Sequence, residues 1–289
     1  GRASALRFAA DPGTEYRLVV DAPAAEALAS PAAPGIVLER QDGRMLFDTG
    51  AARFTVLDDE ALIAEAVLRD GAESRTVLQG SGRGAYVVDQ NGRRARLGGP
   101  GSEMQTTFRV QGPRWTVLRK EGWYVTDEGA RIARGIVWLH FHGGSPRVKL
   151  VHRLVLTENT NKTWFQDIGI EFQAAFEGRD AAFDVTPGAA PADPLRVALP
   201  AGAEAWMLQD DYPHFLERGS HYAVALQQDG ATQELASGAV CGDWCELTGS
   251  ESGFGIALRD FAPQFPKEFT VTPRGVTARL WSGRPGRAL

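Results

Sequence analysis

Apolar and polar residues alternate over short stretches of this chain, and turn-forming residues separate the stretches. Alternation with a period of two predicts β-strands, because successive side chains of a strand point to opposite faces. The separators include Asp42-Gly43 and the runs DTG, DG, GSGRG and QNG, which favour tight turns. Runs of strand length occupy residues 15–20, 36–40, 44–47, 52–57, 62–69, 84–88, 106–119 with a break at Gly112-Pro113, 123–126, 132–142, 147–156, 164–172, 205–208, 222–226, 254–258, 269–272 and 277–281.

Two segments allow other interpretations. Residues 58–68 also fit one amphipathic helix, although the surrounding turn signals favour a strand. Residues 178–194 form the longest stretch rich in Gly, Pro and Asp, and a surface loop is predicted there. No sequence repeat of fixed period is visible, and turn signals recur at short intervals. The pattern therefore predicts an all-β chain built as a large antiparallel β-sandwich.

The clearest predicted element is a hairpin of residues 136–142 and 147–156, joined by the four residues 143–146. One face is predicted to hold the pairs His142 with Arg147, His140 with Lys149, Trp138 with Val151, and Ile136 with Arg153. The other face is predicted to belong to the core, with Phe141, Leu139 and Val137 opposite Val148, Leu150 and His152. His152 is therefore interpreted as a core histidine with a hydrogen-bond partner.

Composition narrows the classes of partner. The chain has 289 residues and a net charge of −5, and it contains no long basic run, which argues against a nucleic-acid or anionic-membrane binder. Its apolar runs are far shorter than the roughly 20 residues that span a bilayer. The first residues contain neither an initiator Met nor a hydrophobic signal region, so a processed start or a piece of a longer protein is expected. The cellular compartment stays open, as does the bonding of Cys241 and Cys245.

The first face of the hairpin carries an indole, two imidazoles and three cationic groups. Trp offers an apolar surface to a sugar ring, Arg and Lys can neutralise a carboxylate, and His titrates near neutral pH. This assortment suits an anionic sugar, although a solvated strand surface would have a similar composition. His140 and His142 point the same way, but no third ligand has a diagnostic spacing. No metal site and no cofactor are predicted.

A second polar cluster occupies residues 209–222, where loop residues could bind a ligand or could simply be ordinary loop composition. The members of this cluster are Asp210, Asp211, Tyr212, His214, Arg218, His221 and Tyr222. Most of the scattered aromatic residues Trp115, Trp123, Tyr124, Trp164 and Trp206 are expected to be buried. The patterns GxSxG, GxGxxG and HExxH and the P-loop are not found in the sequence.

The order of several segments resembles the exo-rhamnogalacturonan lyase-like (YetA-like) family. These segments are DTGAARFTV, LIAEAVLRDG, VVDQNG, the region from GPRWTVLRKEG to WFQDIGIEF, and ESGFGIALRDFAPQFPKEFTVTPRGVTARLW. The resemblance implies a β-sandwich over residues 49–289 and a remnant of a RIFT-related barrel over residues 1–48. It also implies a C-terminal helical (α/α) toroid as a partner domain, which this sequence does not contain.

The resemblance further implies β-elimination on an acidic, rhamnose- and uronate-containing polysaccharide or oligosaccharide. Such chemistry needs a base, an acid and a group that neutralises the uronate carboxylate. The residue types suggest His140 or His142 as the base and Tyr212 or Tyr222 as the acid. Arg147 and Lys149 would neutralise the carboxylate, and Trp138 would offer a stacking surface. The further binding residues would be Arg153, His214 and Arg218. The alternatives are a non-catalytic glycan-binding or scaffold module and, more distantly, a sugar-phosphate or mutarotase-like enzyme.

Overall fold

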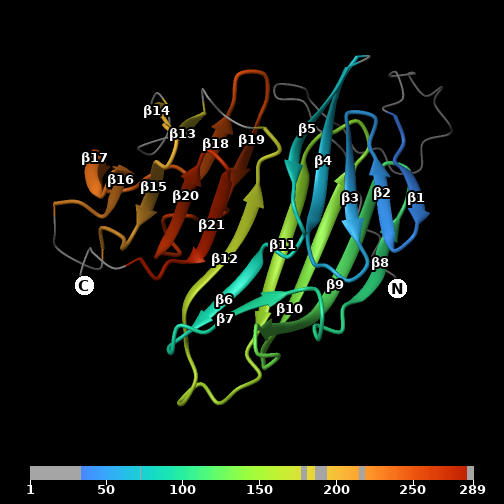
Figure 1. Cartoon of the computed structure of the whole chain (residues 1–289), viewed down its shortest axis with the longest axis horizontal. Coiled ribbons are helices and arrows are strands. Elements are labelled where there is room, and N and C mark those ends of the chain that lie inside the picture. Colours follow the sequence, from blue (N-terminus) through green and yellow to red (C-terminus); the bar gives the residue numbers. More distant parts are fainter. Residues whose placement is uncertain (1–33, 72, 177–180, 186–193, 215–218, 285–289) are drawn as a thin grey trace, which may run out of the picture. The chain divides into compact units, whose positions relative to one another are not determined.

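The computed structural model describes residues 34–71, 73–176, 181–185, 194–214 and 219–284, and all regular structure in these ranges is β-strand (Figure 1). The described residues fall into one compact unit. They contain no helix of the length and apolarity needed to cross a membrane. The predicted all-β class is confirmed. The apolar run at residues 15–20 lies outside the described residues.

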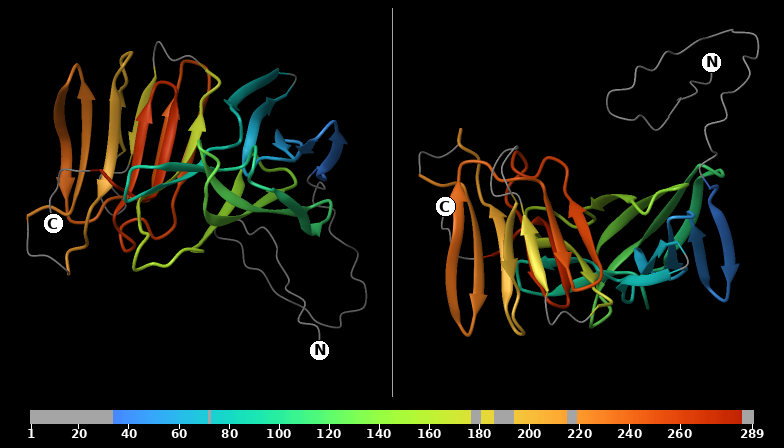
Figure 2. Two further views of the ribbon diagram at one scale, coloured as in Figure 1. Left: turned by 60° about the horizontal axis from the view of Figure 1, so that its bottom comes forward. Right: turned by 90° about the horizontal axis from the view of Figure 1, so that it is seen from above.

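The strands form three antiparallel sheets. The five-stranded sheet contains, in order, β1 (Val37–Gln41), β2 (Arg44–Asp48), β3 (Ala52–Leu57), β4 (Ile63–Asp70) and β5 (Glu73–Gln79). The four-stranded sheet contains, in order, β14 (Leu195–Ala198), β13 (Ala182–Val185), β18 (Trp244–Thr248) and β19 (Gly253–Ala257). The two views in Figure 2 follow the same strands from other sides.

The largest sheet has twelve strands. Its order is β11 (Val148–Val155), β10 (Arg131–His142), β9 (Trp115–Thr126), β7 (Arg94–Leu97), β6 (Ala85–Asp89), β12 (Phe165–Gln173), β21 (Gly275–Trp281), β20 (Lys267–Thr272), β15 (Glu204–Gln209), β16 (Tyr222–Gln228) and β17 (Ala231–Gly238), and β8 (Gln105–Gln111) also pairs with β9.

This large sheet supports two hydrophobic cores. In the first, Phe47 and Phe54 of the five-stranded sheet pack with Leu118, Val137 and Phe141 of strands β9 and β10. In the second, residues of the four-stranded sheet pack against strands β15, β16, β20 and β21; its members include Phe183, Leu247, Met207, Val224, Phe269 and Val271. The fold is therefore a β-sandwich in which one large sheet is covered by two smaller sheets.

The sandwich begins before the domain boundary suggested at residues 48 and 49. Strand β2 pairs with β3 through Phe47 opposite Phe54 and Asp48 opposite Arg53, so the five-stranded sheet runs across that boundary. Within the described residues, no closed barrel is formed. The resemblance of the preceding residues to a barrel stays a prediction, because residues 1–33 lie outside the described part.

The structure corrects several predicted elements. The helical alternative for residues 58–68 is wrong, because Ile63–Asp70 is a strand. The predicted loop at 178–194 contains strand β13, whose four residues are all buried. The break expected after residue 119 is absent, and Trp115–Thr126 forms one strand of twelve residues. The prediction missed β5, β7, β14, β17 and β18 altogether.

A buried lysine explains why the long strand β9 continues through a polar stretch. The Lys120 side chain is fully buried, and its ammonium donates hydrogen bonds to the carbonyl oxygens of Leu57 (2.9 Å) and Asp58 (2.8 Å). Burial lowers the pKa of Lys120 to about 8, and the nearby acidic residues oppose this shift. The lysine thus fastens the connection after β3 to the twelve-stranded sheet.

The predicted hairpin register is confirmed for three of its four pairs. His140 lies opposite Lys149, Trp138 opposite Val151, and Ile136 opposite Arg153. The fourth pair, His142 with Arg147, lies just beyond the last strand pair, Phe141 with Val148, because β11 begins at Val148. The predicted core face of the hairpin is also confirmed, since Val137 lies opposite His152 and both face the first core. The Tyr124 hydroxyl, 2.6 Å from His152 Nε2, supplies the expected partner of that histidine.

The first core generates a prediction about which hairpin face carries stability. Phe141 is fully buried and stacks on Phe47 with 4.1 Å between ring centroids, so Phe141→Ala leaves a cavity. We expect this variant to lose about 3–5 kcal/mol of unfolding free energy. Val151 is 38% exposed on the opposite face, and Val151→Ala should cost less than about 1 kcal/mol. Urea unfolding measures the two losses of unfolding free energy, and both variants should keep the wild-type m-value. Similar losses for the two variants would contradict the assignment of faces.

His152 predicts a loss of stability in mild acid. Burial lowers its pKa to about 4 from an ordinary value near 6.5. As pH falls from 6.5 to 4, the unfolded chain takes up this proton before the folded chain does, so folding stability decreases over that window. We expect His152 to account for a decrease on the order of 2 kcal/mol.

A variant pair isolates the contribution of His152. His152→Gln keeps a hydrogen-bonding group beside Tyr124 but does not titrate, so its unfolding free energy should depend less on pH between 6.5 and 4 than that of the wild type. His214→Gln, at an exposed histidine, serves as the matched control and should retain the wild-type dependence. Parallel profiles for the wild type and His152→Gln, measured by urea unfolding, would contradict this role.

Candidate functional site

The candidate site is the face of β9, β10 and β11 that points away from the first core. Because Val137, Leu139 and Phe141 of β10 fill the core, the alternating residues of this strand must point to the other side. We call this surface the basic face. It consists of Trp115, Arg119, Glu121 and Trp123 from β9, Arg134, Trp138, His140 and His142 from β10, and Lys149, Val151 and Arg153 from β11.

Trp138 lies between two guanidinium groups on the basic face. It pairs with Arg119 of β9 and with Val151 of β11. The Arg153 guanidinium lies 5.3 Å from the Trp138 ring centroid, and the Arg119 guanidinium lies 5.8 Å from it. Both distances are within the range of cation–π attraction. The cations therefore hold the indole in place while its neighbour Val151 remains exposed to solvent.

The two histidines of β10 pack against Trp115. The ring centroids of Trp115 and His140 are 6.0 Å apart with planes inclined by 22°, and those of Trp115 and His142 are 6.4 Å apart at 11°. His142 is exposed, and His140 is partly exposed. The predicted grouping of His140, His142, Trp138, Lys149 and Arg153 on one face is present in the structure.

Positive charge is in excess on this face. Glu121 forms ion pairs with Arg119 and with Arg134, the latter at 2.7 Å. Arg134 also lies 5.3 Å from the ring centroid of Trp123, so the carboxylate and the indole both order this guanidinium. Lys149, Arg153 and the adjacent Arg147 are exposed. Among the residues that the structure describes, the cations near this surface outnumber the one carboxylate on it, Glu121, and an anionic ligand would compensate them.

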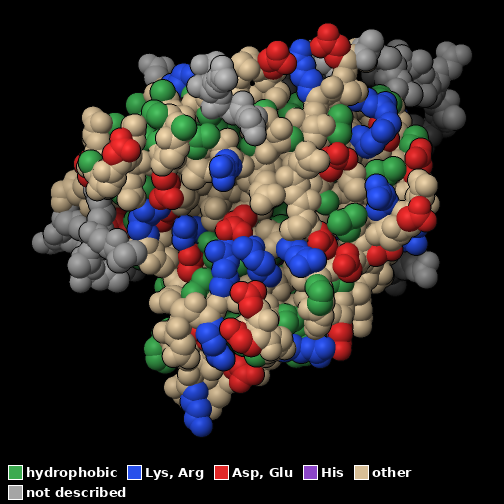
Figure 3. All heavy atoms as spheres, viewed as in Figure 1, with side chains coloured by type: hydrophobic (Ala, Val, Ile, Leu, Met, Phe, Trp, Pro, Cys, Tyr) green, Lys and Arg blue, Asp and Glu red, His purple; other side chains and the backbone are tan. Residues whose placement is uncertain are grey.

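The middle of the twelve-stranded sheet carries charge of a different kind. Figure 3 shows Lys and Arg side chains interleaved with Asp and Glu near the centre of one face of the molecule. The ion pairs of the middle strands include Arg96 with Glu171 at 2.8 Å and Arg284 with Glu268 at 2.7 Å. Burial alone would raise the pKa of Glu268, but Arg284 and Arg279 lower it. These charges compensate each other within the protein.

The second predicted cluster does not form one exposed site. The rings of Tyr212 and His214 are in contact, with centroids 5.6 Å apart, and His214 is exposed. Tyr222 is buried, and burial raises the pKa of its hydroxyl, so the assignment of Tyr222 as a surface acid is not supported. Arg218 lies outside the described residues.

The most polar residues of this cluster have a structural role that the sequence did not reveal. Asp211 and His221 are buried and hydrogen-bonded to each other through His221 Nδ1. Beside them, the buried amide of Gln209 donates to the carbonyl oxygens of Asp211 (2.6 Å) and Ala239 (3.0 Å) and accepts from the N–H of Cys241 (2.9 Å). The cluster thus connects the end of β15 to the residue before β16 and to the segment after β17.

The sheet order separates the two predicted groups of catalytic residues. Seven strands lie between β10, which carries His140 and His142, and β16, which begins at Tyr222. At about 4.8 Å per strand, the separation measured along the sheet is about 38 Å. The structure therefore does not bring the proposed histidine bases and tyrosine acids together in one site.

Several other expectations can be compared with the structure. Of the five aromatic residues expected to be mostly core, Tyr124 is buried, whereas Trp164 is 58% exposed and the other three are partly exposed, so that expectation is wrong. Cys241 and Cys245 are buried thiols that are not bonded to each other, and burial raises the pKa of Cys241 to about 12. Among the described residues, no group of three His, Cys, Asp or Glu residues could hold a metal ion.

No family model matches this chain, and no curated protein matches its sequence. The resemblance to the lyase-like family thus stays a prediction based on the spaced segments.

Proposed function

We propose that this chain binds an acidic polysaccharide or oligosaccharide on its basic face. The observation that carries the proposal is Trp138, held between Arg119 and Arg153 beside the exposed Val151. An indole presents a flat apolar surface to a sugar ring, and a guanidinium binds a carboxylate through charge-assisted hydrogen bonds. The excess of cations supports an acidic ligand over a neutral one.

The length of the basic face favours an extended ligand. Trp115 and Trp123 are eight positions apart on β9, and residues of a strand advance by about 3.4 Å each. The two indoles are therefore separated by about 27 Å along the strand, which is several sugar rings long. Trp138 pairs with Arg119, halfway between them. Three aromatic positions along one strand direction suit a linear glycan.

β-Elimination is a second candidate function, supported by His140 lying opposite Lys149. In this reaction a histidine would remove the proton on C5 of a uronate, while the ammonium would compensate the charge that develops on the carboxylate. The electron pair would form the C4–C5 double bond as the C4–O bond breaks, and the departing oxygen would take up a proton. That proton would come from outside the basic face, since Tyr222 is remote in the sheet. The toroid implied by the family resemblance could supply it.

The binding proposal predicts a specific loss of affinity. In calorimetric titration with a rhamnogalacturonan oligosaccharide, Trp138→Ala should weaken binding about tenfold or more, because a lost stacking contact of about 1.4 kcal/mol corresponds to that factor. Arg153→Ala should weaken binding less and reduce its salt dependence. Trp164→Ala and Arg259→Ala are matched controls at exposed residues that are not part of the basic face, and they should bind as the wild type does. Equal loss in the control variants, or equal affinity for a neutral polysaccharide, contradicts the proposal.

The elimination candidate is tested by its product. Incubation with the same oligosaccharide should generate the ultraviolet absorbance of an unsaturated uronate, and the double variant His140→Ala/His142→Ala should abolish that signal with little loss of binding. A helical domain, if the full-length protein contains one, belongs in the assay. Binding without any unsaturated product in the full-length protein would leave the glycan-binding function and reject elimination.

A further inference from the structure

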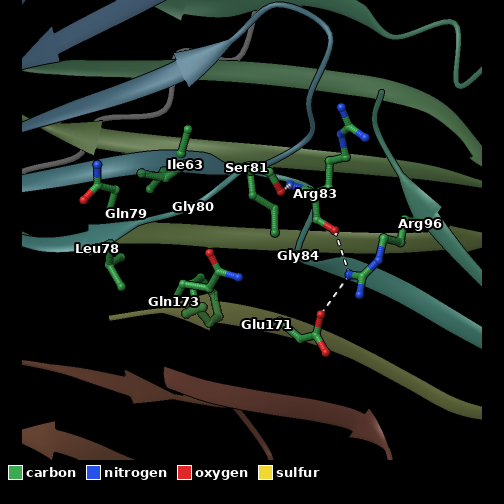
Figure 4. A pocket seen from close by; sticks show the side chains of 14 residues that line it. Ile63, Leu78, Gln79, Gly80, Ser81, Arg83, Gly84, Arg96, Glu171 and Gln173 are labelled. Atoms are coloured by element: carbon green, nitrogen blue, oxygen red, sulfur yellow. Dashed lines mark hydrogen bonds and ion pairs between the residues drawn. The ribbon is translucent and has the colours of Figure 1, made fainter. Parts of the chain in front are cut away.

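A pocket opens where the connection between β5 and β6, residues 80–84, passes from the five-stranded to the twelve-stranded sheet (Figure 4). Its volume is 260 Å³, and its remaining walls come from β4, β5, β7 and β12. Pockets for drug-sized ligands hold about 300–1,000 Å³, so this one suits a smaller molecule with a single ring. Its lining residues are different from those of the basic face.

Backbone contacts hold the connecting loop in place from both sheets. The N–H of Gly80 donates to the Ala64 carbonyl of β4 at 2.7 Å, and the N–H of Glu171 on β12 donates to the Gly84 carbonyl at 3.0 Å. Between them, Gly82 has φ of 70°, a conformation that favours glycine. The wall is therefore formed before a ligand arrives, which lowers the entropic cost of binding.

Two guanidinium groups and one carboxylate lie near one end of the pocket. The two oxygens of Glu171 accept hydrogen bonds from Arg94 (2.5 Å) and Arg96 (2.8 Å), so two guanidinium groups share one carboxylate. Arg96 also donates to the Arg83 carbonyl, again through Nη1. Among the described contacts no hydrogen bond engages Nε or Nη2 of Arg96, so these donors are available to one anionic group.

Polar and apolar groups complete the lining. The amide of Gln173 projects toward the centre of the pocket in Figure 4, and a Cβ placed on Gly80 would lie 2.9 Å from its Oε1. An amide can both donate to and accept from a hydroxyl group. Ile63 and Leu78 contribute apolar surface to the same cavity. The lining thus combines guanidinium donors at one end, hydroxyl-binding groups and an apolar wall.

We infer that this pocket binds a polyol of the size of one sugar ring that carries a single carboxylate. The carboxylate contacts Arg96 through the donors on Nε and Nη2. Hydroxyl groups contact Gln173 and Ser81, and the apolar face of the ring packs on Leu78. The pocket is a site additional to the basic face and does not depend on glycan binding there.

Titration of free galacturonate, followed by ligand-observed NMR, tests this inference. The wild type should show saturable binding in the millimolar range. Gln173→Leu removes the hydroxyl-binding amide, and Gly80→Phe places a ring in the cavity; each should weaken binding at least tenfold. Galactose, which lacks the carboxylate, should bind at least tenfold more weakly than galacturonate. Thermal melting establishes that each variant is folded.

Two control variants separate this pocket from the basic face. Gln233→Leu makes the same change at an exposed residue of β17 and should bind galacturonate as the wild type does. Trp138→Ala removes the indole of the basic face and measures how much of the binding occurs there. The inference is overturned if the wild type shows no saturable binding, if galactose binds equally well, or if Trp138→Ala abolishes binding while Gln173→Leu and Gly80→Phe do not. Binding of the polymer to the basic face is measured separately and can succeed or fail independently.

Discussion

Burial of one face of the twelve-stranded sheet against two smaller sheets is the constraint that organises this protein. Since side chains alternate between faces, every strand that contributes to a core must present its intervening residues to the opposite side. Phe141 and Leu139 thus determine that His140 and Trp138 point away from the core. The composition of that other face is then free to serve binding, because stability comes from the buried side.

Two regions of the outer face of the sheet differ in how far their cations are compensated by carboxylates. Toward its middle, Glu268 is fully buried and satisfied by Arg284 and Arg279, which suits a structural network, because a buried charge is tolerated when it is paired and hydrogen-bonded. Around Trp138, cations exceed carboxylates and the outermost side chains reach solvent. This difference in compensation, and not the number of charged residues, distinguishes the basic face as a surface for an anionic ligand.

Separation within the sheet bears on catalysis. A histidine on β10 and a tyrosine on β16 cannot act on one bond when seven strands lie between them. Catalytic groups must lie within hydrogen-bond reach of the reacting atoms. The geometry of this chain therefore supports recognition more directly than a reaction that uses these histidines and tyrosines as one acid–base pair.

Periodicity and turn residues determined the all-β class, most of the strands, and the hairpin register that places His140 opposite Lys149, because each of these follows from neighbours in the chain. The sequence pattern did not predict strands such as β13, because their few apolar residues lie among Gly and Pro and contacts with other strands stabilise them. The loop GSGRG was a turn signal in the sequence, and only packing between two sheets made it the wall of a pocket. Likewise, the sequence predicted Asp211 and His221 as loop residues that bind a ligand or are ordinary loop composition, but tertiary contacts buried them as a pair. The sequence thus determined what is local, and the tertiary structure alone decided which distant side chains meet and, among the residues it describes, where cations outnumber carboxylates.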